Sequence, residues 1–263
     1  MPADRSERKD MSMKRALRNL MKTAHLVLIL AAAASLAAAE PLKLAEDLQE
    51  DVRVNLNERA DYVYSFRYPC VDESDPSAEL INGFFRYKAE DTVGFEIPMN
   101  ADYYRGENPS QDVTVKIDYS VTCNTDDYFG VLVRTVQGEM TDYTGYTFSR
   151  GDLKPGSSVA LPYLLGTLAG DEKDTWLQDR QTARADALVR DLVWEALEDR
   201  DGKDLHLWED LDRETLDYCF FPEEDFYLDE TGSPVFYLQP GFADDSGRLI
   251  TFPISVEEIL DEM

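Results

Sequence analysis

Few side chains in this sequence could perform chemistry, and their spacing matches no familiar catalytic motif. Of the two histidines, His25 lies in an N-terminal apolar segment, which leaves His206 alone. A Ser-His-Asp or Cys-His mechanism would depend on that single residue, and a histidine-rich zinc site is excluded. There is no G-x-G-x-x-G, P-loop or G-x-S-x-G motif, so nucleotide binding and serine-hydrolase chemistry lack support. We expect His206 to be a surface or helix-start histidine.

The three cysteines, Cys70, Cys123 and Cys219, form no C-x-x-C pair, which argues against a zinc thiolate site or a redox dithiol. In an exported protein two of them could form a disulfide, with three possible connectivities. All three could equally be small hydrophobic residues with free thiols. Spacing alone does not decide between these alternatives, and both stay open.

Carboxylates are so frequent that a glycosidase-like pair, two acids about 5–10 Å apart, carries almost no specificity. The turn Asp199–Asp204 gathers acids around Gly202 but lacks the order of a calcium-binding loop and its Glu at the twelfth position. We expect a solvated acidic turn there. Trp176, Trp194 and Trp208 lie in expected helices, where core packing is favoured over stacking on sugars. The sequence therefore predicts no catalytic, cofactor-binding or metal-binding residue.

Residues 1–39 have the composition of an export signal. Seven Lys and Arg precede the apolar run Ala24–Leu36, and the segment ends in Ala37-Ala38-Ala39 before Glu40. The apolar run is shorter than the roughly 20 residues of a membrane span, so we expect cleavage and release rather than anchoring. A buried N-terminal helix is the alternative. The long basic region makes either Met1 or Met13 a plausible start.

The rest of the chain has the composition of an acidic, well-packed domain. The 263 residues carry a net charge of −27 and include 12 Phe, 14 Tyr and 3 Trp, far more aromatic residues than a disordered acidic tail contains. Residues 40–263 hold 19 Lys and Arg against 50 Asp and Glu, a charge near −31. Such a charge argues against binding nucleic acid or anionic lipid, and we expect no membrane span after cleavage.

Hydrophobic periodicity predicts strands and helices in separate blocks, which is typical of an α+β fold with a sheet of hairpins and helices packed on it. Residues 40–58 are polar, and we expect a flexible lead-in. Two α+β regions, 59–150 and 151–263, would pack as one unit. The expected strands are 62–68, 113–123, 129–136, 226–228, 235–238 and 249–254, and the expected helices begin near 75, 174, 208 and 256.

The C-terminal third resembles a family of exported bacterial domains. The run Phe226–Gly241 is similar to its Phe-Tyr-Leu … Gly … Val-Phe-Tyr-Phe … Pro hairpin, and Ser246–Ser255 to its closing strand. Asp152–Gly156 resembles its Asp-Leu-Lys-Thr-Gly turn, and Tyr68-Pro69 its Tyr-Pro step. This domain of unknown function is shared by the extracellular part of the lysozyme-sensing anti-sigma factor RsiV, the N-terminal region of the peptidoglycan deacetylase PdaC and many secreted proteins of Gram-positive bacteria.

The resemblance implies an α+β fold and a non-catalytic binding domain at the cell envelope. RsiV-like proteins bind lysozyme, a cationic protein, and a surface near −31 would speed the encounter with such a partner. The charge could equally serve only solubility. The alternative function is that of a carboxylate-dependent enzyme acting on cell-wall glycan. An accessory subunit, the third hypothesis, would show a large exposed apolar patch.

Overall fold

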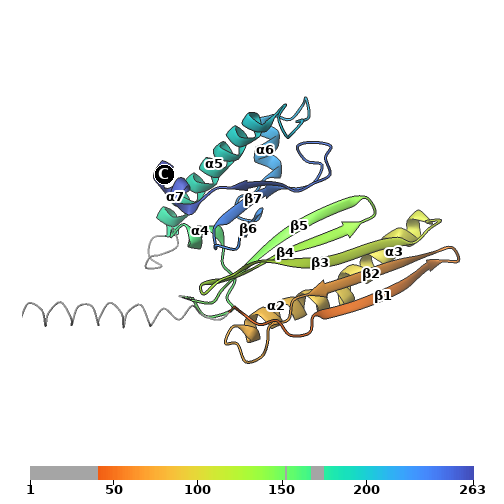
Figure 1. The fold of residues 1–263 in the computed structure, drawn as a ribbon. Helices are drawn as coiled ribbons and strands as arrows, with labels where there is room; N and C mark the ends of the chain where they lie inside the picture. Colours follow the sequence, from red (N-terminus) through yellow and green to blue (C-terminus); the bar gives the residue numbers. More distant parts are fainter. Residues whose placement is uncertain (1–40, 152, 167–174) are drawn as a thin grey trace, which may run out of the picture. The chain divides into compact units, whose positions relative to one another are not determined.

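A five-stranded sheet with the order β1-β2-β3-β4-β5 carries the N-terminal region of the chain (Figure 1). The computed structural model describes residues 41–151, 153–166 and 175–263, and of residues 175–178 only the backbone. Pro41–Met263 is one compact unit. The predicted export signal, residues 1–39, lies outside the described residues. None of the described helices is long and apolar enough to cross a membrane.

All strand pairs of this sheet are antiparallel except β2 with β3, which are parallel. The chain passes from β2 to β3 through three consecutive helical segments, which lie along one face of the sheet in Figure 1. We call this face the inner face and the opposite one the outer face. The elements are β1 (Leu48–Asn57), β2 (Ala60–Tyr68), α2 (Ala78–Asp91), the π-helix η1 (Thr92–Glu96), α3 (Ile97–Glu107), β3 (Val113–Asn124), β4 (Tyr128–Gln137) and β5 (Met140–Ser149).

The alternation predicted for β2 is what places its aromatic side chains in the core. Tyr62, Tyr64, Phe66 and Tyr68 are all buried on the inner face, because every second residue of a strand points the same way. Tyr68 stacks on Phe85 of α2, with ring centroids 5.5 Å apart. Burying such rings stabilises the sheet–helix contact by aromatic packing beyond the area they cover.

The prediction of a flexible lead-in over residues 40–58 is wrong, because Leu48–Asn57 forms the edge strand β1. Its even-numbered apolar residues, such as Val52 and Val54, share the inner face with their partners Tyr64 and Tyr62. Its odd-numbered residues are polar because they face solvent. Edge strands are commonly charged, which discourages pairing with other chains, and that polarity obscured the strand in the sequence.

A three-stranded antiparallel sheet, β6-β7-β8, carries the C-terminal region. Its side chains join those of the helices in a second core that includes Val193, Leu197, Phe236 and Ile250. The helix expected at 208–216 begins only at Arg213, where the Asp212 carboxylate accepts a hydrogen bond from the Thr215 amide at 2.8 Å. The elements are α4 (Leu161–Leu164), α5 (Thr175–Arg200), α6 (Arg213–Cys219), β6 (Phe226–Leu228), β7 (Pro234–Leu238), β8 (Ile250–Pro253) and α7 (Val256–Glu262).

The two sheets meet where β5 passes β6. A Cβ atom on Gly145 would lie 1.9 Å from the Phe226 carbonyl oxygen, so only glycine allows the two backbones to approach this closely. The Gly145 amide donates to the Tyr237 hydroxyl at 3.1 Å, and the Tyr143 amide to Gln239 Oε1 at 2.9 Å. Tyr237 of β7 and Gln239, the residue that follows β7, thereby accept hydrogen bonds from outward backbone amides of β5. The predicted α+β class is confirmed.

Candidate functional site

The side chains that the sequence singled out for chemistry do not come together. His206 is exposed and lines neither of the two cavities described below. Cys70, Cys123 and Cys219 are free, being half-buried, buried and exposed respectively, so the disulfide alternative is not realised. Burial raises the pKa of the Cys123 thiol, which disfavours the reactive thiolate.

The acids at the two ends of the turn Asp199–Asp204 form ion pairs with basic side chains of the same turn. Asp199 pairs with Lys203 at 2.7 Å and Asp204 with Arg200 at 2.8 Å. The carboxylate of Asp201 accepts a hydrogen bond from the Leu207 amide at 3.1 Å. Within the described part of the chain, no group of three or more His, Cys, Asp or Glu could hold a metal ion.

The prediction of core packing is wrong for Trp208, which is 42% exposed. The reason is the late start of α6, which leaves Trp208 in a turn rather than on an apolar helix face. Its indole nitrogen donates to the Gly241 carbonyl oxygen at 3.4 Å. Trp194 is half-buried against the C-terminal core, as predicted, and the side chain of Trp176 lies outside the described residues.

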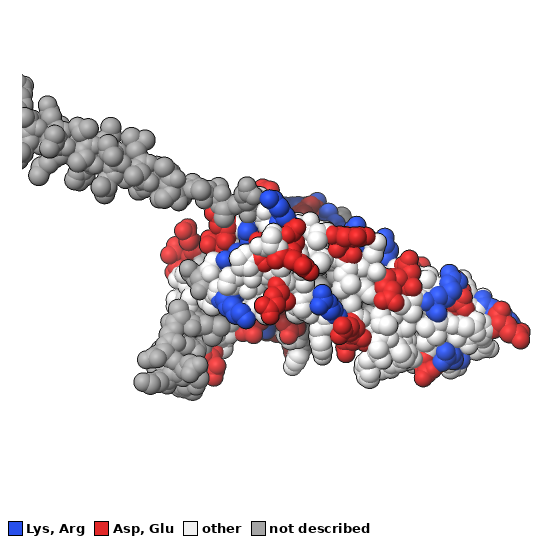
Figure 2. All heavy atoms as spheres, turned by 90° about the horizontal axis from the view of Figure 1, so that it is seen from below, with Lys and Arg blue, Asp and Glu red and all other residues white. Residues whose placement is uncertain are grey.

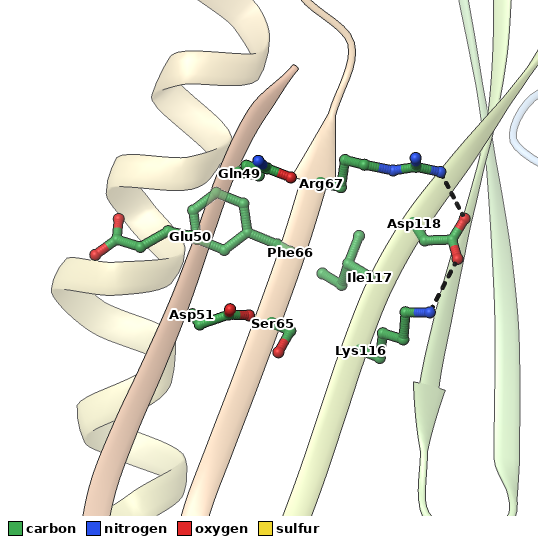
Figure 3. A pocket seen from close by; sticks show the side chains of 9 residues that line it. All are labelled: Gln49, Glu50, Asp51, Ser65, Phe66, Arg67, Lys116, Ile117 and Asp118. Carbon is green, nitrogen blue, oxygen red and sulfur yellow. Dashed lines mark ion pairs between the residues drawn. The ribbon is translucent and has the colours of Figure 1, made fainter. Parts of the chain in front are cut away.

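The larger cavity is a groove of about 560 Å³ over strands β1, β2 and β3. We call it the sheet-face groove (Figure 3). Strand register brings its outer-face side chains into rows, since Gln49 pairs with Arg67, and Asp51 with Ser65, which in turn pairs with Lys116. The remaining lining residues are Asp118, on the same face, and Glu50, Phe66 and Ile117, whose side chains alternate to the inner face. Three adjacent strands thus present a polar surface whose geometry is fixed by backbone pairing.

The charges of the sheet-face groove are partly paired with one another. Asp118 lies 3.7 Å from Arg67 and 3.5 Å from Lys116, the two contacts that Figure 3 marks. Arg67 also lies 3.7 Å from Asp47, which accepts a hydrogen bond from the Tyr119 hydroxyl. The separations are long and the side chains partly exposed, so each pair stabilises the fold little. These charged side chains can instead form ion pairs and hydrogen bonds with the polar groups of a binding partner.

A smaller cavity, of about 250 Å³, lies on the inner face of the same sheet. We call it the tyrosine pocket. Its aromatic lining comes from Tyr64 and Tyr68 of β2, Tyr146 of β5 and Tyr87 of α2. The other lining residues are Lys88, Asp91, Thr92, Glu96, Ile117, Val133, Thr135 and Thr144. Helix α2 and the π-helix meet the sheet beside β4 and β5, and the pocket is the space between them.

The π-helix places two polar residues of the tyrosine pocket. Thr92 and Glu96 begin and end η1, and the Thr92 hydroxyl lies 3.2 Å from Glu96 Oε2. The intervening Val93-Gly94-Phe95 holds weak helix formers, so a wider turn is tolerated there. π-Helical turns are rare and occur frequently at functional sites. Burial raises the pKa of Tyr68 to about 12, with the neighbouring Tyr146 and Glu96 adding to the effect.

Two solved structures resemble this chain, and both are described as DUF3298 proteins. One, from Bacteroides fragilis NCTC 9343, has 12% sequence identity and a TM-score of 0.42, covering 86% of this chain and 94% of its own. The other, from Pseudomonas aeruginosa PAO1, has 12% identity and a TM-score of 0.43, covering 84% and 94%. The structural match is to DUF3298 proteins. RsiV and the N-terminal region of PdaC share this family of unknown function. No family model and no curated protein matches the sequence.

One carboxyl group outside both cavities has a strongly altered titration. Burial raises the pKa of Asp186 on α5 to about 6, with a contribution from Glu223, while Arg190 acts in the opposite direction. Among the described residues, its Oδ1 atom is buried without a hydrogen-bond partner. Asp186 lines neither the sheet-face groove nor the tyrosine pocket, so it is not one of a pair of acids facing each other across either cavity.

Sequence reasoning missed both cavities for the same reason. The groove residues come from β1, β2 and β3, and the pocket residues from β2, α2, η1, β3, β4 and β5, so neither set has a spacing that a motif could capture. A partial signal existed in β3, where Lys116 and Asp118 were expected on the solvent face. Lys116 is exposed and Asp118 half-exposed.

Proposed function

We propose that the chain is an exported, non-catalytic binding domain of the cell envelope, and that its sheet-face groove receives a cationic protein partner. The observation that carries this proposal is the exposed, polar outer face over β1–β3 with its groove. On the neighbouring part of the same face, β5 is instead packed against β6 at Gly145. The outer face is therefore covered by β6 at β5 and is accessible to a partner over β1–β3.

The charge around the groove supports a cationic partner. Asp47, Asp51 and Asp118 outnumber Arg67 and Lys116, and residues 40–263 carry a charge near −31. Such a field accelerates the encounter with a basic protein and fixes its orientation more than it adds affinity. Figure 2 shows acidic and basic side chains interspersed over the face of the molecule that is seen from below, which is typical of surfaces that keep a protein soluble.

The carboxyl groups favour binding over hydrolysis. A glycosidase needs two acids across a cleft, one with a raised pKa. Among the described residues, the two carboxyl groups whose pKa is raised are Asp186 and Asp225, and neither lines the sheet-face groove or the tyrosine pocket. The enzyme alternative thus has no observation of its own in its favour.

The test is binding of hen lysozyme, the cationic protein that the resemblance to RsiV-like proteins suggests. Surface plasmon resonance at about 20 mM and 150 mM salt should give a Kd that weakens steeply with salt, because screening shortens the reach of the charges. The double variant Gln49→Lys with Asp51→Lys, both on the outer face of β1, should slow association at low salt by about tenfold or more. Glu209→Lys, an exposed residue of the C-terminal region, is the control for the change in net charge.

The outcomes distinguish binding in the sheet-face groove from attraction by the net charge of the whole protein. If Glu209→Lys slows association as much per charge as the groove variant, the partner responds to net charge and the groove is not its site. If lysozyme shows no binding even at low salt, it is not the partner, and a cationic partner would require another basic protein to bind in the same assay.

A further inference from the structure

The tyrosine pocket has no role in the function proposed above, since it lies on the opposite face of the sheet from the groove. Its deepest side chains are polar yet strongly buried, with Tyr64 and Tyr68 each 3% exposed and Thr92 4%. The Thr92 side chain opposes the rise that burial causes in the pKa of both phenols, and its hydroxyl contacts Glu96 Oε2 at 3.2 Å. The cavity has a volume of about 250 Å³ and hydroxyl groups at its base. Burying polar groups is costly, so a core that served only packing would have apolar side chains at these positions.

The mouth of the pocket is open and also polar. Tyr87 is 69% exposed, and Asp91 and Thr144 are exposed at the same opening. Between base and mouth lie the Glu96 carboxylate, which accepts hydrogen bonds, and the Thr135 hydroxyl, which donates and accepts them. The lining therefore combines aromatic side chains with hydrogen-bonding groups of both kinds, as small-ligand sites combine apolar walls with a few polar contacts.

The charges of the pocket restrict the chemistry of the ligand. The Lys88 ammonium group already stands over the Tyr146 ring at 5.0 Å and over the Phe84 ring at 5.7 Å. Lys88 thus occupies the face of the Tyr146 ring to which a cationic ligand would bind. Its own positive charge would also repel such a ligand. Asp91 and Glu96 oppose an anion. What remains favourable is a neutral ligand that exchanges hydrogen bonds with hydroxyls and carboxylates.

We infer that the tyrosine pocket is a binding site for a neutral, hydroxyl-rich ring, a saccharide unit, with Glu96 and Thr92 as its hydrogen-bonding residues and Tyr87 as its aromatic wall. The apolar C–H face of a sugar ring packs on an aromatic side chain, while its hydroxyls reach the polar groups. The volume suits one ring rather than a chain. A single sugar of about twelve heavy atoms should bind with a Kd of about 1–10 mM.

The experiment is a titration of the labelled protein with glucose and with N-acetylglucosamine, followed by amide chemical shifts. The expected shifts cluster at residues 92–96 and 144–146. Glu96→Gln, which exchanges an acceptor oxygen for a donor amide, should weaken binding by about fivefold or more. Thr144→Ala, at the exposed mouth, is a second lining variant and should weaken binding less. Glu90→Gln, exposed on α2 and outside the lining, is the matched control and should leave the Kd unchanged.

Three results would overturn the inference. The first is a folded protein whose residues 92–96 and 144–146 do not shift with either sugar. The second is binding that Glu96→Gln and Glu90→Gln affect equally. The third is localised binding of tetramethylammonium or inorganic phosphate that is tighter than that of both sugars, because the ligand class would then be charged. Lysozyme binding through the groove is independent of all three, so the two proposals fail separately.

Discussion

At the scale of single residues, Asp186 shows how burial changes a carboxyl group without making a site. Its pKa is raised to about 6, so the folded state retains a proton that the unfolded chain releases near its ordinary value of 3.8. The folded protein therefore binds more protons between these values, and its stability falls as the pH rises through them. Above the folded pKa this loss is complete and remains constant.

The substitution Asp186→Asn removes this cost, because an amide resembles the protonated acid. At pH 7 to 8 we expect the free energy of unfolding to increase by about 1 kcal/mol, after allowance for solvent screening of a partly buried group. Near pH 4 the variant and the parent protein should be equally stable. Urea denaturation at several pH values measures both quantities.

The control for this prediction is Asp179→Asn, an exposed residue of the same helix, which removes one negative charge without a buried carboxyl. A stabilisation of equal size in both variants would show that the reduced net charge, rather than the burial of Asp186, is responsible. A decrease in stability for Asp186→Asn at pH 8 would contradict the prediction outright.

At the scale of elements, the contact between β5 and β6 depends on one missing side chain. Gly145 lies where a Cβ atom would meet the Phe226 carbonyl oxygen and carbonyl carbon, both of which belong to backbone and cannot rotate away. The neighbouring hydrogen bonds that the β5 amides of Gly145 and Tyr143 donate to the Tyr237 hydroxyl and to Gln239 Oε1 require the same close approach. The two sheets are thus joined here by a close backbone contact and by the hydrogen bonds of these two side chains.

The substitution Gly145→Ala should separate β5 from β6 and decrease the free energy of unfolding by about 3 kcal/mol, at the upper end of what overpacking costs. Gly83→Ala is the matched control, since nothing lies within 4 Å of its added Cβ and alanine is the better helix former by up to about 1 kcal/mol. Chemical denaturation of both variants measures the difference. Equal stability of Gly145→Ala and the parent would show that the strands separate at little cost.

Elements that face the core on alternate residues were predictable from the sequence, whereas the edge strand and the cavities were not. Tyr62 to Tyr68 and Val113 to Cys123 carry a period of two, and both segments are strands. In β1 the polar outward residues obscure Val52 and Val54. Thr92 and Glu96 become pocket residues only through the π-helix, a local change of helical period that hydrophobic spacing does not encode.

At the scale of the whole molecule, the excess of Asp and Glu over Lys and Arg affects folding stability as well as the rate at which a partner associates. A charge near −31 on residues 40–263 implies self-repulsion in the folded state. The surface ion pairs that oppose it, such as Arg53 with Asp61 at 2.8 Å, are partly exposed and contribute little each. We therefore expect repulsion between the excess acids to dominate the effect of ionic strength on folding stability.

Raising the salt concentration from about 10 mM to about 150 mM should consequently increase Tm by about 2–4 °C, because screening weakens the long-range repulsion. Differential scanning calorimetry in sodium chloride measures the change, and a parallel series in urea at fixed temperature checks it. A decrease in Tm over this range would mean that specific ion pairs outweigh the repulsion of the excess acids.

The parallel pairing of β2 with β3 has a further consequence for how the chain reaches its fold. The pairs β3–β4 and β4–β5 close through short turns, whereas Tyr62 meets Val113 only after the whole helical crossover has been placed. Closing a long loop costs chain entropy before its contacts are gained. When the crossover folds into helices over the inner face, the connection between β2 and β3 becomes shorter and costs less entropy to close. We therefore expect pairing of β2 with β3 to depend on this segment, which also lines the tyrosine pocket.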